Sequence, residues 1–431
     1  MKKFIPLFFL AFYFLGNAQT RTIISDWTSY VYPVNIEDKK NWDFRVTVKI
    51  RKGNVNDLNC AIWCRIDNKD DTYGFFENKF YDTKVTTEWK TYEIKGTVDP
   101  KAQTMNIGAF AQGNGDYYFD DFKLEMKNGK SKWEEVPLKN SGFESDLSSN
   151  NGWIEGVSLK KPTHVTNFTI STSDVKPFSG KKSLLIKGQN IIGNMPNGKF
   201  VEANGVKLYY ETYGEGEPVL MLHGNGQSIS AFMNQVEEFS KKYKVIIVDC
   251  RGRGQSGYDK TKELTFDLQT EDLKQFLDKL NIKKVKILGW SDGGILAITL
   301  ALKYPELIDR IACSGANIFP EGINDDGLKS LKDAVTNLMK DNKDHKNDIL
   351  IDLYNLDLKY PNLKYDDLKK IHCPALIIAG DKDEIKTEHT VKTAESLPKG
   401  QLAIIPNSTH YVPELKPEIF NKLVLEFFEN K

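Results

Sequence analysis

The chain has 431 residues, which is enough for two domains of ordinary size. Lysine and arginine together number 59, and aspartate and glutamate also number 59, so the formal net charge is zero. This balance argues against a nucleic-acid partner and against attraction to an acidic membrane surface.

The first eighteen residues predict an export signal. Two lysines precede an apolar run over 4–15, and Gly16-Asn17-Ala18 supplies the small residues of a cleavage site. The run is shorter than the ~20 residues that a membrane span requires. We therefore expect residues 1–18 to be a signal peptide. The mature protein is expected to be periplasmic or secreted and to have no integral membrane segment.

Residues 20–191 have the pattern of a β-sandwich. Apolar and polar residues alternate over 44–53, 89–96 and 117–126, and glycine-containing turns separate these runs. No segment of helical period and useful length interrupts them. The first half is therefore expected to be an all-β domain.

Two stretches of this half resemble carbohydrate-binding modules of the galactose-binding-like jelly-roll type. "TEWKTYEIKGTVDPKAQTMNIGAFAQGNGDYYFDDFKLEM" is similar to their closing strands, and "NSGFESDLSSNNGWIEG" with "FSGKKSLLIKG" is similar to their opening strands. Because the opening motif follows the closing one, we expect a permuted or swapped arrangement within one sandwich. Two partial modules are the alternative. The resemblance implies a polysaccharide as a partner of this domain.

The same resemblance implies a structural calcium site. The matching positions are Glu144 of the "GFE" motif and Asp120 or Asp121 of the "DD" pair, and carboxylates suit this hard ion. The alternative is that these are ordinary solvated carboxylates in loops. No other metal or cofactor is expected, since no metal-ligand spacing occurs in the sequence.

After a predicted linker at 192–199 the pattern changes. Apolar strands alternate with segments of helical period over 200–431, which predicts a mostly parallel sheet with helices on both faces. Two helical stretches within about 317–368 interrupt this alternation and are expected to form a short cap. The predicted strands are 218–224, 244–250, 284–290, 309–315, 374–380 and 400–406, and the clearest helices are 266–280 and 417–428.

One junction in this half carries a nucleophile motif. Gly289-Trp290-Ser291-Asp292-Gly293 fits G-x-S-x-G between a predicted strand and a predicted helix. A sharp turn there lifts the serine hydroxyl off the sheet, and nearby side chains would clash, which explains the glycines. A glycine-rich packing turn is the alternative, and the flanking strand and helix argue against it.

A serine hydroxyl needs a base, and the base needs an orienting acid. Such groups gather at the carboxyl ends of the strands of an α/β sheet. Asp383 follows one predicted strand and His410 follows the next, which gives the chain order Ser, Asp, His. Asp381 and Glu384 are rival acids in the same loop. The other histidines are weaker candidates for the base: His164, His223, His345, His372 and His389.

At this point residues 199–431 resemble an α/β-hydrolase of the small-lipase, enol-lactonase and non-haem peroxidase group. The matching stretches are "LHGNGQS", "DCRGRGQS", "GWSDGG", "LIIAGDKD" and "NSTH". The resemblance implies that Ser291 is the nucleophile, Asp383 the acid and His410 the base. It also implies that the backbone N–H groups of Asn225 and Asp292 form the oxyanion hole.

The sequence therefore predicts an exported serine hydrolase, and a carboxylesterase is the favoured class. Its substrate is expected to be a small or carbohydrate-linked ester that passes through an acyl-serine. Peroxidase-type enzymes and carbon–carbon bond hydrolases share this triad, and they are alternative classes for this protein. A non-catalytic surface or glycan-binding protein with a relic hydrolase domain is the rival of another class. "RGRG" departs from the commoner R-G-H-G, and we expect Arg253 to lie in a loop near the rim of the site.

Overall fold

The computed structural model describes residues 20–70, 72–80, 83–147, 151–340, 342, 345 and 347–430. The predicted signal peptide at 1–18 lies outside these residues. The chain divides into two compact units, Met1–Asn194 and Met195–Lys431. Among the described residues, no helix is long and apolar enough to cross a membrane.

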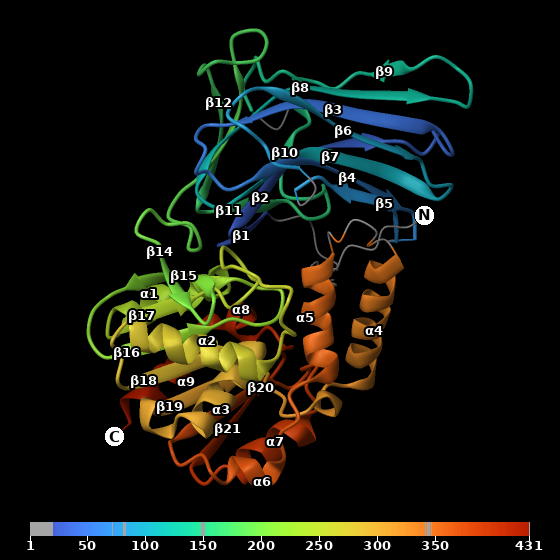
Figure 1. Ribbon diagram of the computed structural model, residues 1–431. Helices are drawn as coiled ribbons and strands as arrows, with labels where there is room; N and C mark the ends of the chain where they lie inside the picture. The colour runs from blue at the N-terminus through green and yellow to red at the C-terminus, as the bar shows by residue number, and fades with distance from the viewer. Residues whose placement is uncertain are drawn as a thin grey trace. The chain divides into compact units, whose positions relative to one another are not determined.

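The first unit is built from two antiparallel sheets (Figure 1). Within the described ranges, one sheet has five strands in the order β10-β2-β7-β4-β5, and the other has the order β12-β13-β8-β3-β6, with β9 paired to β8. Their bounds are β2 Trp27–Asn35, β3 Asp43–Lys52, β4 Cys60–Asn68, β5 Tyr73–Asn78, β6 Lys90–Thr97, β7 Ala102–Gln112, β8 Gly115–Lys127, β9 Glu134–Val136, β10 Ile154–Glu155, β12 Phe168–Ser173 and β13 Ser183–Gly188. A short parallel pair joins β1 Arg21–Ile23 to β11 Thr163–Val165.

Alternation along the strands builds the core of this unit. Phe44, Val46, Val48 and Ile50 of β3 are all buried, while the residues between them point to the opposite face. β13, from the stretch similar to opening strands, pairs antiparallel with β8, from the stretch similar to closing strands. Both stretches therefore belong to one sandwich, and the all-β prediction for this half is confirmed.

The carboxylates of the expected calcium site accept backbone hydrogen bonds. Asp120 accepts from the N–H groups of Phe178 and Ser179, and Glu144 accepts from those of Lys181 and Lys182. No group of three or more histidines, cysteines or acidic residues among the described ones is arranged to hold a metal ion. The calcium site stays a prediction that rests on the resemblance.

The second unit is a mostly parallel sheet with helices on both faces, as predicted. In the described part of the chain its eight strands have the order β14-β15-β17-β16-β18-β19-β20-β21. β14 and β15 are antiparallel to their neighbours, and the other strands pair in parallel. The bounds are β14 Lys199–Ala203, β15 Val206–Tyr213, β16 Pro218–Leu222, β17 Lys244–Val248, β18 Val285–Trp290, β19 Ile308–Ser314, β20 Ala375–Gly380 and β21 Gly400–Ile405.

The observed strand boundaries agree closely with those predicted from the sequence. Parallel strands are buried on both sides, so each one appears in the sequence as an apolar run. β18 and β20, for example, are buried at every residue. α2 and α3 share one core with one face of the sheet, and α1 and α9 pack together on the other (Figure 1). The helices are α1 Met233–Ser240, α2 Phe266–Lys279, α3 Asp292–Lys303, α7 Thr387–Ser396, α8 Val412–Leu415 and α9 Pro417–Glu429.

Three further helices lie between β19 and β20 in the chain: α4 Asp325–Lys340, α5 Asp348–Lys359 and α6 Tyr365–Leu368. They fall within the segment expected to form a cap. α4 and α5 run side by side (Figure 1) and pack along most of their length. α5 carries a residue that reaches the site described next.

Candidate active site

The turn after β18 holds Ser291 in a backbone conformation that few residues adopt. Its φ is 57° and its ψ is −119°, and α3 begins at the next residue. A Cβ on Gly293 would lie 1.8 Å from the carbonyl oxygen of Leu222, and one on Gly289 would lie 2.2 Å from the carbonyl oxygen of Gly293. Only glycine fits these two positions, so the motif has the steric reason that the sequence suggested.

His410 and Asp383 form a hydrogen-bonded pair at the ends of the last two strands. Nδ1 of His410 lies 2.7 Å from Oδ1 of Asp383. The Asp383 side chain is 1% exposed and that of His410 is 12% exposed. Because Nδ1 donates to the carboxylate, Nε2 is left with its lone pair and can accept a proton.

Contacts within and around this pair shift the pKa values of both groups. Burial alone would raise the pKa of Asp383, but His410 and the N–H groups of Ile385 and Gly380 lower it below its usual value. Burial likewise opposes charge on His410, yet the Asp383 carboxylate outweighs it and raises the pKa of the imidazole. This combination stabilises the imidazolium that a general base becomes.

Two hydrogen bonds and one close approach of the backbone place His410 near the nucleophile turn. The indole Nε1 of Trp290 donates to the backbone oxygen of His410 at 3.0 Å. The N–H of Ser291 donates to the carbonyl of Ser314 at 2.7 Å. Gly315 follows Ser314, and a Cβ on it would lie only 2.6 Å from Cε1 of His410. The sheet therefore assembles Ser291, His410 and Asp383 from three separate loops.

The rival residues have other partners. Asp381 is exposed and accepts the N–H of Ser408 at 3.0 Å, and Glu384 is also exposed. His389 packs against Phe319 and accepts the N–H of Ile318. His164 lies in the β-sandwich unit, and His345 and His372 are exposed on the surface. His223 is buried and accepts a backbone hydrogen bond.

His223 shapes the loop in which Asn225 lies. Its Nε2 accepts the N–H of Cys250 at 3.0 Å, so Nδ1 carries the proton and donates to the carbonyl of Gly224 at 2.9 Å. Burial lowers the pKa of His223 to about 3, which keeps the ring neutral. Gln227 accepts the N–H of Gly224 at 2.8 Å and closes the same loop.

The two N–H groups expected to form the oxyanion hole are unused. Neither Asn225 nor Asp292 donates its backbone N–H to any described residue. A Cβ on Gly224, the neighbour of Asn225, would lie 3.0 Å from Cβ of Ser291, so this loop approaches the serine closely. Two unpaired N–H groups at the start of α3 and in the facing loop suit a developing negative charge.

A network that the sequence did not reveal lies beneath this hole. Arg253 is buried, not at the rim as expected, and its guanidinium donates to the carboxylate of Asp292 and to Gln269. The departure from R-G-H-G thus places a cation under the nucleophile turn. The side chain of Asn225 donates to Oδ2 of Asp357 in α5 at 2.8 Å.

Asp357 joins this network, and its surroundings favour the neutral carboxylic acid. Burial and the neighbouring Asp292 carboxylate raise its pKa well above the usual value. Oδ1 of Asp292 is buried and has no hydrogen-bond donor among the described residues, and a protonated Asp357 would be a suitable donor for it. Asn225 also donates to the carbonyl of Leu353 at 2.7 Å. The cap helix α5 is therefore fastened to the loop of the oxyanion hole.

Comparison with known proteins identifies the family of the second unit. Residues 217–355 match the family model described as alpha/beta hydrolase fold. The human serine hydrolase BPHL is 30% identical over 254 residues, which cover 53% of this chain and 85% of the relative. The chain therefore belongs to the α/β-hydrolase fold family.

Two further similarities lie in the same half of the chain. A 2-hydroxy-6-oxononadienedioate/2-hydroxy-6-oxononatrienedioate hydrolase from Paraburkholderia phymatum is 29% identical over 262 residues, covering 52% of this chain and 91% of the relative. The structure of a meta-cleavage product hydrolase from Pseudomonas fluorescens matches with 25% identity and a TM-score of 0.45, over 54% of this chain and 97% of that chain. The family match and the two sequence relatives together identify the chain as a hydrolase of this fold.

Proposed function

We propose that the protein is an exported serine hydrolase that cleaves carboxylic esters, with Ser291 as nucleophile, His410 as base and Asp383 as orienting acid. The observation that carries this proposal is the His410–Asp383 hydrogen bond beside the strained turn of Ser291. Asn225 and Asp292 supply the oxyanion hole through their backbone N–H groups. The substrate is a small or carbohydrate-linked ester.

The reaction runs in two halves. Nε2 of His410 takes the proton of Ser291 as Oγ attacks the ester carbonyl, and the two N–H groups stabilise the oxyanion by about 3–4 kcal/mol each. His410 then gives its proton to the leaving alcohol, and an acyl-serine remains. Water attacks this intermediate with His410 again as base, and the acid is released as Ser291 regains its proton.

A fluorophosphonate probe tests the assignment. The purified protein should be labelled once, at Ser291, and should hydrolyse p-nitrophenyl acetate. Ser291→Ala should remove the label and lower kcat by about 10⁴-fold or more while leaving the circular dichroism spectrum unchanged. A wild-type protein that takes up no label and hydrolyses no ester would favour the non-catalytic alternative with a relic hydrolase unit.

Carbon–carbon bond hydrolysis is the second candidate, because one of the similar proteins is named a 2-hydroxy-6-oxononadienedioate hydrolase. A panel that sets acetylated and feruloylated sugars beside 2-hydroxy-6-oxo-dienoates separates the two reactions. We expect a higher kcat/KM for an ester. The opposite ranking would keep the triad and change the substrate class.

Export and polysaccharide binding complete the proposal. The charged and apolar start of the chain supports a signal peptide, and the β-sandwich supports an accessory binding module. Such a module raises the effective concentration of an enzyme near an insoluble substrate. Expression in a bacterial host tests the first part: the exported protein should begin at Gln19, and retention in the cytoplasm with an intact Met1 would contradict it.

A further inference from the structure

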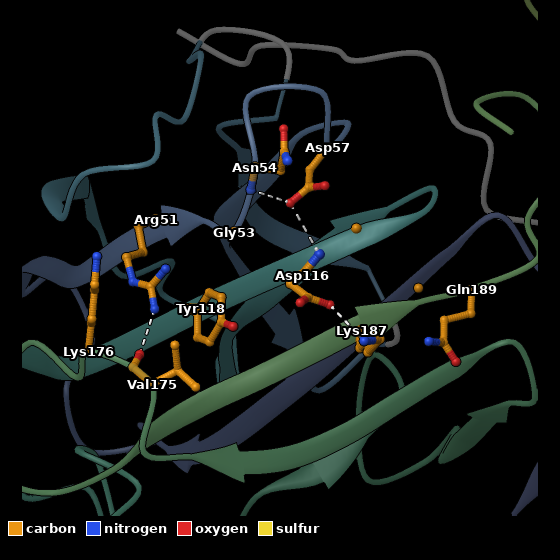
Figure 2. A pocket seen from close by; sticks show the side chains of 12 residues that line it. Arg51, Gly53, Asn54, Asp57, Asp116, Tyr118, Val175, Lys176, Lys187 and Gln189 are labelled. Carbon is orange, nitrogen blue, oxygen red and sulfur yellow. Dashed lines mark hydrogen bonds and ion pairs between the residues drawn. The ribbon is translucent and has the colours of Figure 1, made fainter. Parts of the chain in front are cut away.

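A hollow of about 500 Å³ opens on the outer face of the six-stranded sheet of the β-sandwich unit (Figure 2). Strands β3, β8 and β13 form its floor, and the turn that follows β12 closes one end. Its lining is polar and charged around a single aromatic ring. The lining residues are Arg51, Gly53, Asn54, Asp57, Gly115, Asp116, Tyr118, Val175, Lys176, Lys187, Gly188 and Gln189.

Arg51 is the unusual member of this lining. It is only 6% exposed, yet among the described residues it forms no ion pair with a carboxylate. Its guanidinium lies 3.7 Å from the ring centroid of Tyr118 and 5.1 Å from that of Trp89, and it donates to the carbonyl of Val175 at 2.6 Å. Nε has no partner. Aromatic faces offset part of the cost of burying this charge, but they leave it uncompensated.

The carboxylates of the hollow are already engaged. Asp57 accepts the N–H groups of Asn54 at 2.8 Å and Asp116 at 3.3 Å, and Asp116 pairs with Lys187 at 3.5 Å. Lys176 is exposed and makes no ion pair with a described residue. Arg51 and Lys176 lie at one end of the hollow and the Asp116–Lys187 pair lies toward the other (Figure 2). One end therefore carries unpaired positive charge.

We propose that this hollow binds an acidic saccharide, with the carboxylate of a uronic acid at the Arg51–Lys176 end. The opposite end suits sugar hydroxyls, because Asn54, Gln189 and the Asp57 carboxylate offer both donors and acceptors. This inference rests on the polysaccharide binding in the proposed function, and it names the class of polysaccharide.

Affinity electrophoresis of the full-length mature protein tests the proposal. Native gels should contain polygalacturonate, its fully methyl-esterified form or a neutral glucan. We expect retardation by polygalacturonate, which weakens with added salt, and little retardation by the other two polymers. Lys176→Glu should weaken the binding about fivefold, as expected for losing one partly exposed ion pair. Lys176 is exposed, so this variant should fold normally.

Lys132→Glu is the matched control, because Lys132 is an exposed lysine of the same unit outside the hollow. It carries the same change in net charge and should bind polygalacturonate like the wild type. Equal losses of binding in both variants would show that only the net charge of the protein matters, which would overturn the proposal. So would the absence of retardation, or equal retardation by the methyl-esterified polymer.

A second readout separates this site from the active site. Ser291→Ala should lose ester hydrolysis and keep the retardation, and Lys176→Glu should show the weakened retardation and keep hydrolysis of a soluble ester. Failure of the saccharide site would thus leave the hydrolase assignment untouched.

Discussion

Buried guanidinium groups have different partners in the two units. In the hydrolase unit, Arg251 pairs with Asp272 and Arg253 pairs with Asp292, and all four side chains are almost fully buried. In the β-sandwich unit Arg65 pairs with Asp67. Arg51 contacts aromatic rings and backbone carbonyl groups, and no described carboxylate pairs with it. A buried guanidinium that pairs with a carboxylate fixes the position of that carboxylate. A buried guanidinium without a carboxylate partner keeps a positive potential that can attract an anionic ligand.

The pairing in the hydrolase unit extends to the candidate triad. Asp383 and His410 are a third such pair, and we propose that their orientation serves proton transfer. The comparison suggests that removing one member of such a pair should do far more damage than removing Arg51. The following substitutions test this in order of expected effect.

The largest effect is expected for Asp383→Asn, which should lower kcat by about 10⁴-fold because the histidine loses both its tautomer and its counter-charge. Asp381→Asn should change kcat less than threefold, since the Asp381 side chain is exposed and accepts from the backbone of the turn at Asn407 and Ser408. Ester hydrolysis by the two purified variants decides between them. A crippled Asp381→Asn enzyme would reassign the acid and keep the triad.

The same pair sets the pH dependence. Hydrolysis needs neutral His410, so the rate should rise with pH through the pKa of this group. Asp383 raises that pKa above the ordinary value of about 6.5. The rising limb should therefore have its midpoint above pH 6.5 in the wild type, and the residual activity of Asp383→Asn should have a lower midpoint. A wild-type midpoint below pH 6 would contradict this.

Next in size is the cost of losing a buried cation. Arg253→Met leaves Asp292 without its counter-charge and should reduce the free energy of unfolding by about 3–5 kcal/mol. Arg51→Met leaves no carboxylate without a partner and removes only the stacking on aromatic rings. It should therefore reduce the free energy of unfolding by about 2 kcal/mol or less. Urea unfolding followed by circular dichroism measures both. Equal costs would remove the distinction between the two units.

A smaller effect is expected at the neutral acid of the cap helix. Asp357→Leu removes the donor to Asp292 and the acceptor for Asn225, and should lower kcat about tenfold through a misplaced oxyanion loop. Asp357→Asn keeps one donor and one acceptor and should stay within about threefold. A loss in both variants that appears only in KM would indicate substrate contact and not positioning of the loop.

The smallest effect is expected from separating the units. Residues 195–431 contain their own sheet, core and all candidate triad residues. Expressed alone, this piece should hydrolyse a soluble short-chain ester within about twofold of the full chain. The piece spanning residues 20–191 should keep the retardation by polygalacturonate. An insoluble or inactive hydrolase piece would show that the two parts depend on each other.

Much of the hydrolase fold could be predicted because its strands are apolar on both faces and its nucleophile turn needs glycines. The geometry also favours Asp383 over Asp381, although the two residues stand two positions apart and only the family resemblance separated them in the sequence. Strand alternation likewise predicted the β-sandwich, since each strand buries one face.

The remaining features depend on contacts between distant segments. The prediction for Arg253 was wrong because its motif gave no sign of the buried carboxylate that it would meet. Asp357 lies in a helix whose pattern marks only a cap, and its partner Asn225 is 132 residues away. Arg51 stands at an outward position of an alternating strand, and its burial depends on the turn near Val175, 124 residues later.

The hydrogen bond from Trp290 to His410 has a spectroscopic consequence. Of the seven tryptophans, Trp290 alone follows residue 195; the others are Trp27, Trp42, Trp63, Trp89, Trp133 and Trp153. In a fragment that begins at residue 195, all indole fluorescence therefore comes from one buried ring bonded to the backbone of the base and adjacent in sequence to the nucleophile. If Ser291 is acylated as proposed, we expect the emission of this ring to change, because its hydrogen-bond partner lies in the histidine loop.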